Sequence, residues 1–99
     1  MKIKPKVLFL GCNYDEIPYL KTLQERGFHV VATDINPDAP GMKLADSEII
    51  CGYDDFKCLD KAISKEGFEN FAMVFTASSQ FAHIGASHIS KQLGLPYPS

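Results

Sequence analysis

The stretch KVLFLGCNYDEIPYL, residues 6–20, decides the expected fold. Its apolar run from Val7 to Leu10 has no polar interruption, which is typical of a parallel strand buried on both faces. Gly11 follows as a turn residue without Cβ sterics, and apolar residues then recur at helical spacing. We therefore expect a central strand, a tight turn and a helix. Open α/β sheets place ligands at the carboxyl ends of their strands, so a site is expected at this turn.

The following segments continue the alternation of helix and strand. A helix is predicted from Asp15, whose side chain can cap the first turn, to Gly27. A glycine there can adopt the left-handed backbone conformation that commonly ends a helix. Residues 29–33 are rich in β-branched side chains and predict a second strand that ends on Asp34. Residues 35–46 contain two prolines, one glycine and three Asp or Asn, which break regular structure, and we expect a loop there.

The second half of the chain repeats the pattern. Residues 47–51 predict a short edge strand, and apolar residues at intervals of three and four across 56–63 predict a helix. Residues 72–75 form another apolar run and predict a further strand, with 76–80 as its carboxyl-end loop. A third helix is predicted over residues 81–94.

This alternation predicts a single α/β domain over residues 1–99. Its parallel sheet should have right-handed crossovers, because nearly all such connections turn that way. We expect a Rossmann-like, three-layer half of a doubly wound sheet, with about four strands in the order 3-2-1-4 and helices on both faces. The loops 11–15 and 76–80 would then face each other across a crevice at the topological switch point.

Composition excludes several classes of partner. The chain is 45% hydrophobic and 22% charged, and its formal net charge of -2 provides no basic surface for nucleic acid or an anionic membrane. The basic start, residues 1–6, is too short for a signal sequence, so we expect a cytoplasmic protein. Cys12, Cys51 and Cys58 are odd in number and lack C-x-x-C spacing, which predicts three reduced thiols.

A dinucleotide fingerprint is incomplete in this chain. Gly11 could be its first glycine and Asp34 the acid that holds a ribose, but Asn13 and Glu16 stand where the second and third glycines are needed. Binding of NAD or FAD is therefore not expected. Asp34 keeps two interpretations: it binds a hydroxyl or amine of a ligand, or it caps the turn that follows it.

No catalytic residue and no metal site is assigned from the sequence. Cys12 precedes a helix, where the dipole lowers the pKa of a thiol, but no histidine lies near it to complete a nucleophilic set. His83 and His88 are five residues apart on a predicted helix and cannot share a metal ion. Asp55 is interpreted as a helix cap, and the chain contains no Walker loop.

A family resemblance comes from five short motifs in a fixed order. They are Gly11, Asp34-Ile35-Asn36-Pro37, Pro40-Gly41, Ala45-Asp46 and Gly94-Leu95-Pro96-Tyr97-Pro98-Ser99. Together they resemble the amino-terminal, pre-ATP-grasp domain of ATP-grasp ligases. These carboxylate–amine or carboxylate–thiol ligases include carbamoyl phosphate synthase and biotin carboxylase. The resemblance covers nearly the whole chain and implies a domain truncated from a longer ligase.

The resemblance also implies a reaction for the parent protein. A carboxylate and ATP would form an acyl phosphate, which an amine or another nucleophile then attacks. A downstream ATP-grasp domain of the same chain would hold ATP and Mg²⁺, so the fragment alone should have no cofactor and no activity. A small-molecule carboxylate or amine is the expected substrate, and the resemblance allows a homodimer of the parent.

The loops that face the acceptor substrate in this family map onto the predicted crevice. The implied substrate-binding residues are Gly11, Cys12, Asn13, Tyr14, Asp34, Thr76, Ser78 and Ser79. Many relatives carry an acid in the second loop, whereas this chain has Thr76-Ala77-Ser78-Ser79-Gln80, which leaves the substrate open. The alternative is a stand-alone Rossmann-like module that binds a nucleotide, a dinucleotide or another protein.

Overall fold

The computed structural model describes residues 4–11, 14–52, 55–67 and 71–76, together with residues 88, 91 and 94. Strands alternate with helices along these ranges, except that the second and third strands are joined by a loop, and one 3₁₀ turn, η1, precedes the first helix. The elements are β1 (Lys6–Leu10), η1 (Tyr14–Glu16), α1 (Ile17–Glu25), β2 (His29–Asp34), β3 (Ser47–Ile50), α2 (Phe56–Glu66) and β4 (Phe71–Thr76).

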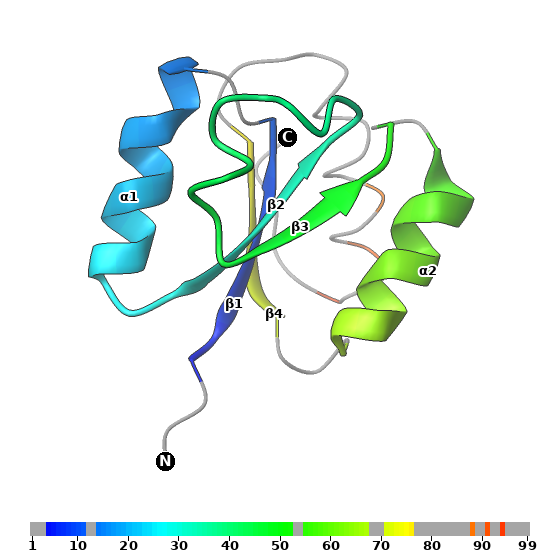
Figure 1. Ribbon diagram of the computed structural model, residues 1–99. Coiled ribbons are helices and arrows are strands. Elements are labelled where there is room, and N and C mark those ends of the chain that lie inside the picture. Colours follow the sequence, from blue (N-terminus) through cyan, green and yellow to red (C-terminus); the bar gives the residue numbers. More distant parts are fainter. Residues whose placement is uncertain are drawn as a thin grey trace.

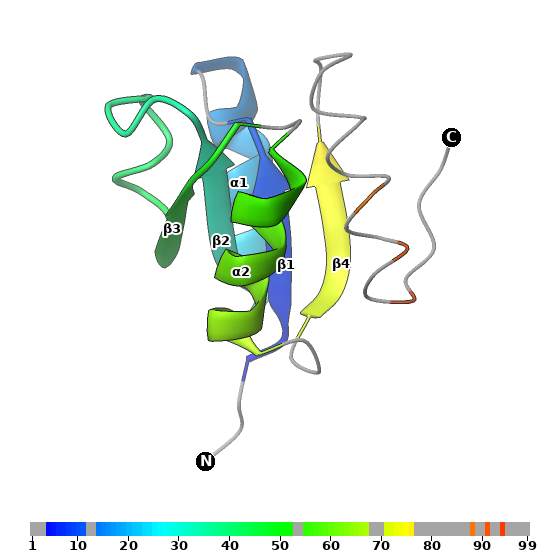
Figure 2. The ribbon, with the colours of Figure 1, turned by 90° about the vertical axis from the view of Figure 1, so that its right-hand side faces the viewer.

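The described strands form one parallel sheet between two helices. Its four strands have the order β3-β2-β1-β4, and every neighbouring pair is parallel (Figure 1). Helices α1 and α2 cover opposite faces of the sheet (Figure 2). The predicted α/β class and strand order are therefore confirmed. Of the predicted third helix, the structure describes residues 88, 91 and 94, and His88 and Lys91 are helical as predicted. The rest of that helix and the loop 77–80 lie outside the described residues.

The core consists of two clusters, because successive side chains of a strand point to opposite faces. Leu8 and Leu10 of β1 pack toward α2, where Leu59 and Ile63 are fully buried. On the opposite side of the sheet is the second cluster, whose buried members are Phe9, Leu20, Val30, Ala32, Ala39 and Met42. Ala39 and Met42 come from the predicted loop, which therefore closes one side of the core without regular structure.

The helix ends follow local chemistry with one exception. Asp55 caps α2, because its side chain accepts a hydrogen bond from the backbone N–H of Cys58. Gly27 has a φ of 93°, as expected for a left-handed residue after a helix. The predicted cap at Asp15 is wrong: Asp15 lies inside η1, and α1 begins at Ile17 after Glu16, which makes no side-chain cap bond.

The strand boundaries differ from the predictions by one residue. β4 begins at Phe71 and ends at Thr76, so Thr76 belongs to the strand and not to the loop after it. β3 ends at Ile50, and Cys51 follows the strand. A single residue at an element end is decided by backbone pairing, which side-chain patterns do not report.

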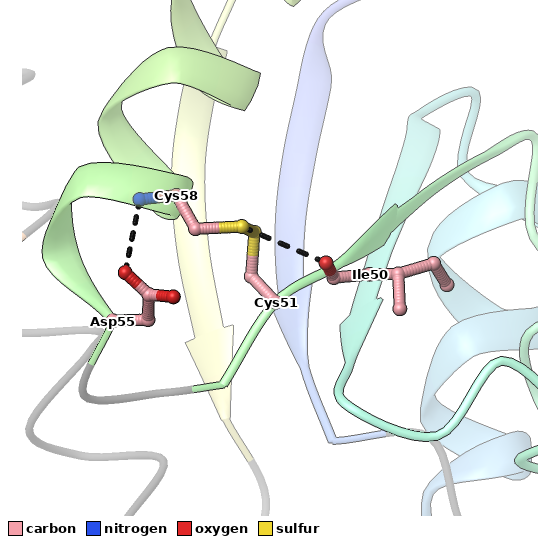
Figure 3. Close-up of a disulfide and its surroundings, with 4 residues drawn as sticks. All are labelled: Ile50, Cys51, Asp55 and Cys58. Carbon is pink, nitrogen blue, oxygen red and sulfur yellow. Dashed lines mark hydrogen bonds between the residues drawn. A yellow bond between two sulfur atoms is a disulfide. The ribbon is translucent and has the colours of Figure 1, made fainter.

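A disulfide joins Cys51 to Cys58 (Figure 3). The prediction of three reduced thiols is therefore wrong for these two residues. Their Cα atoms are 5.9 Å apart, because the end of β3 and the first turn of α2 lie side by side. Their sequence separation of seven fits no short cysteine motif, so the sequence pattern contained no signal for the bond.

Candidate functional site at the carboxyl edge of the sheet

The carboxyl ends of β1, β2 and β4 meet at one edge of the sheet. Leu10, the last residue of β1, is paired with Thr33 on one side and with Thr76 on the other. The parallel register therefore brings the turns after these strands to a common edge, which Figure 1 shows at the top. This is the arrangement predicted for strands 1 and 4, and it is where ligands bind in open α/β sheets.

Gly11 makes the first turn of this edge. Its backbone N–H donates a 2.9 Å hydrogen bond to the carbonyl of Thr33, which extends the β1–β2 pairing by one residue. Its φ of 93° lies in the left-handed region, where any Cβ is strained. The chain therefore needs glycine here to leave the strand sharply.

Asp34 ends β2 and is only 7% exposed. Its Oδ1 accepts a 3.0 Å hydrogen bond from the backbone N–H of Asn36. The turn-capping interpretation of Asp34 is thus confirmed for one carboxylate oxygen. The cap orients the chain as it enters the 35–46 segment. Binding of a ligand by Asp34 stays a prediction.

Two buried hydroxyls flank Leu10 on the α2 side of the sheet. Thr33 and Thr76 are paired with Leu10, so their side chains share its face, and neither Oγ1 has a hydrogen-bond partner among the described residues. An unpaired buried hydroxyl costs about 1–3 kcal/mol relative to a satisfied one. A ligand or water that supplies the missing hydrogen bonds at this edge would remove that cost. Thr76 was predicted as a site residue, whereas Thr33 was missed.

The side chains of Asp34 and Thr76 lie on opposite faces of the sheet. Thr33 faces the α2 side, and Asp34, the next residue, therefore faces the α1 side. The structure brings the strand ends together, but it separates these two predicted residues by the thickness of the sheet. A ligand that contacts both would have to lie over the edge of the sheet.

Tyr14 is 78% exposed in η1, the blue turn that leads into α1 (Figure 1). Tyr19 instead packs its ring against Phe75, with ring centroids 5.6 Å apart, as expected for a packing role. Cys12, Asn13, Ser78 and Ser79 lie outside the described residues. The predicted roles of all eight residues in substrate binding stay predictions.

Sequence reasoning missed the burial of Glu16. This acid lies in η1, directly before α1, and is only 4% exposed. It precedes Leu20 by four residues, so it shares the buried face of the helix that follows. The four-residue spacing between Glu16 and Leu20 could therefore have predicted that Glu16 is buried. Glu16 and Asp34 are thus two buried acids on segments that lead away from the carboxyl edge.

The described residues contain no group of three or more His, Cys, Asp or Glu that could hold a metal ion. No helix within the described ranges is long and apolar enough to span a membrane. Among the described residues, the carboxyl edge carries the hydroxyls of Thr33 and Thr76, which lack partners, and the carboxylate of Asp34. This chemistry suits the recognition and positioning of a polar small molecule.

Comparison with known proteins gives matches in structure. No protein-family model matches the sequence, and no curated protein matches it. Phosphoribosylglycinamide synthetase from Anaerococcus prevotii matches with a TM-score of 0.77 and 18% identity, over 95% of this chain and 23% of that chain. N5-carboxyaminoimidazole ribonucleotide synthetase from Thermotoga maritima matches with a TM-score of 0.68 and 16% identity, over 91% of this chain and 23% of that chain.

The fold is shared with synthetases. A further N5-carboxyaminoimidazole ribonucleotide synthetase, solved as an ADP complex, matches with a TM-score of 0.69 and 20% identity, over 90% of this chain and 23% of that chain. At such low identity the likeness concerns the fold, and at that level it confirms the resemblance drawn from the sequence. The chain spans less than a quarter of the length of each of these synthetases.

Proposed function

We propose that the chain is the amino-terminal, substrate-side domain of an ATP-grasp ligase. The observation that carries this proposal is the structural match over 95% of the chain to phosphoribosylglycinamide synthetase. The synthetases matched in structure are ATP-grasp ligases. The motif order from Gly11 to the Gly94–Ser99 segment independently resembles the same family.

The parent reaction would join a carboxylate to an amine at the expense of ATP. The carboxylate oxygen attacks the γ-phosphorus, ADP leaves, and the amine then displaces phosphate from the acyl phosphate. In this proposal ATP and Mg²⁺ belong to a downstream ATP-grasp domain, as the family resemblance implies, and this chain would contact that domain as its partner.

The contribution of this chain would be to bind and orient the acceptor at the carboxyl edge. Gly11 leaves β1 in a left-handed turn, and its backbone N–H is bonded to the carbonyl of Thr33. Thr33 and Thr76 supply hydroxyls that lack partners within the part of the chain that the structure describes. Held in place, the acceptor loses less entropy on reaction, and the barrier falls accordingly. A cytoplasmic location and a homodimer of the parent belong to the same proposal.

Two measurements test the proposal. In the complete gene product, Thr76→Val should raise the KM of the acceptor several-fold more than that of ATP, because the nucleotide belongs to the other domain. Thr22→Val is the matched control, since Thr22 lies on the exposed side of α1 and its hydroxyl donates to the carbonyl of Pro18. Equal changes in both KM values would contradict the assignment of the acceptor to this edge.

The second measurement uses residues 1–99 alone. Isothermal titration with Mg-ATP should give no heat above dilution, because the described residues form no phosphate-binding constellation. Micromolar binding would contradict the proposal and would favour the stand-alone nucleotide-binding module instead.

A further inference from the structure

A second concave site lies between β3 and α2, and it begins at the carboxyl edge, because Ile50 in its wall is paired with Asp34. Its volume is about 370 Å³, and both cysteines of the disulfide line it. The charged residues in its wall are Glu48, Lys61, Lys65 and Glu66. We call this site the β3–α2 cleft. The sulfur–sulfur bond is therefore part of the wall of an open cleft, in contrast to a disulfide sealed within a core.

The two cysteines differ in their accessibility. Cys51 is 4% exposed and packs in the core cluster beneath α2, whereas Cys58, in the first turn of α2, is half-buried. Figure 3 shows the bridge crossing from the end of β3 to the helix. The carbonyl oxygen of Ile50 lies 3.6 Å from the sulfur of Cys58. In the reduced protein this carbonyl can accept a hydrogen bond from the Cys58 thiol, so the site accommodates both redox states.

The charges of the cleft favour an acidic ligand. Lys61 and Lys65 are four residues apart, so they share one face of α2, and neither forms an ion pair among the described residues. Glu66 is neutralised by Lys6, whose Nζ lies 2.7 Å from its carboxylate. Glu48 is the remaining acid in the wall of the cleft. The wall of the cleft thus holds two lysines against Glu48, and the Asp55 carboxylate beside it accepts a hydrogen bond from the Cys58 N–H.

We propose that the β3–α2 cleft is a thiol–disulfide exchange site for a small thiol that carries carboxylate groups. Lys61 and Lys65 attract the carboxylates and thereby bring the thiolate to the sulfur of Cys58, which is the more accessible cysteine. This inference does not depend on the function proposed for the carboxyl edge.

The exchange has two steps. The thiolate attacks Cys58 Sγ, the disulfide breaks, and its electron pair passes to Cys51 Sγ, which takes a proton from water. A second molecule of the small thiol then attacks the mixed disulfide, and Cys58 leaves as a thiol. Two thiols are oxidised to one external disulfide, and the protein gains two electrons and two protons. The reduced chain has lost the covalent tie between β3 and α2.

The test measures the rate of reduction by glutathione and by its diethyl ester, in which the carboxylates are masked. All proteins carry Cys12→Ser, so that no third thiol can exchange, and acid-quenched samples are counted for free thiols. Glutathione should reduce the Lys61→Gln/Lys65→Gln variant about five-fold more slowly than the parent at low salt, the effect expected of weak ion pairs at both lysines. The ester, which keeps only its positive ammonium group, should not be slowed by the double substitution. Lys21→Gln/Lys43→Gln, which leaves the cleft intact, is the matched control.

Two results would overturn the proposal. One is equal reactivity of glutathione and its ester toward the unaltered cleft, a comparison that needs no variant and therefore stands even if the double substitution unfolds the chain. The other is a disulfide that only denaturant makes reducible. A mixed disulfide with glutathione at Cys58, found by mass spectrometry, would support it.

Discussion

The carboxyl edge and the β3–α2 cleft place their polar groups by different means. At the edge, Gly11, Thr33 and Thr76 meet because three parallel strands end in register. In the cleft, Cys51 and Cys58 meet because α2 returns across the sheet and packs beside the end of β3. A site built from strand ends follows from topology, whereas a site built across a helix–strand contact depends on how the layers pack. The two sites share one core cluster, which contains Leu10 and Cys51.

The largest expected effect on the free energy of unfolding comes from a substitution in β1, at the carboxyl edge. Leu10→Ala should lower the free energy of unfolding by about 3 kcal/mol, because it removes a side chain that is 1% exposed and leaves a cavity between α2 and the sheet. Urea denaturation measures it. Leu44→Ala is the control, since Leu44 is 43% exposed and should cost far less. A near-neutral Leu10→Ala would mean that β1 is not the central strand.

Reduction of the disulfide should lower the free energy of unfolding somewhat less than Leu10→Ala does. The bond closes a ring across a sequence separation of seven, and loop entropy for a ring of about eight residues gives about 2.5 kcal/mol. Urea denaturation of a Cys12→Ser protein with and without dithiothreitol measures this loss without altering the core. In the Cys58→Ser variant the reductant should have no effect. If the oxidised and reduced proteins unfolded at the same urea concentration, the disulfide would not stabilise the packing of α2 against β3.

These two effects show what the sequence could reveal. The apolar run from Val7 to Leu10 and the strand–helix alternation were sufficient for the fold, because burial on both faces removes polar residues from a central strand. The strand order then followed from right-handed crossovers. The disulfide could not be predicted in this way. Its two residues are seven positions apart, and only the packing of α2 against β3 brings them to 5.9 Å.

The sequence predicted where the carboxyl edge lies, but only partly which side chains lie on which face of it. Gly11, Asp34 and Thr76 lie at the carboxyl edge as the pattern indicates, because the end of a strand can be read from where an apolar run stops. The face that each side chain occupies depends on register, and a single residue moves it to the opposite face. Asp34 and Thr76 therefore came out on opposite sides of the sheet, and Thr33 went unnoticed beside Asp34.

A smaller effect, of opposite sign, is expected at the unpaired hydroxyls. Thr33→Val should stabilise the chain by about 1 kcal/mol, because it replaces a fully buried hydroxyl that has no partner with a methyl group of the same shape. Thermal unfolding at neutral pH measures it. Thr22→Val should give no gain, since the Thr22 hydroxyl already has an acceptor 2.9 Å away. If Thr33→Val is destabilising, its hydroxyl already has a partner in solution.

The smallest expected effect separates the two roles of Asp34. Asp34→Asn keeps an oxygen that can accept the hydrogen bond from Asn36, so it should change the free energy of unfolding by less than about 0.5 kcal/mol. Asp34→Ala removes that oxygen and should cost about 1 kcal/mol. In the complete gene product, if it has the proposed ligase activity, a charge-dependent contact with a substrate amine would show as a raised acceptor KM in both variants, whereas a purely structural cap would be rescued by asparagine in KM as well as in stability. Urea denaturation and steady-state kinetics on the same pair of variants therefore decide whether the edge binds its ligand through this carboxylate or through the hydroxyls on the other face.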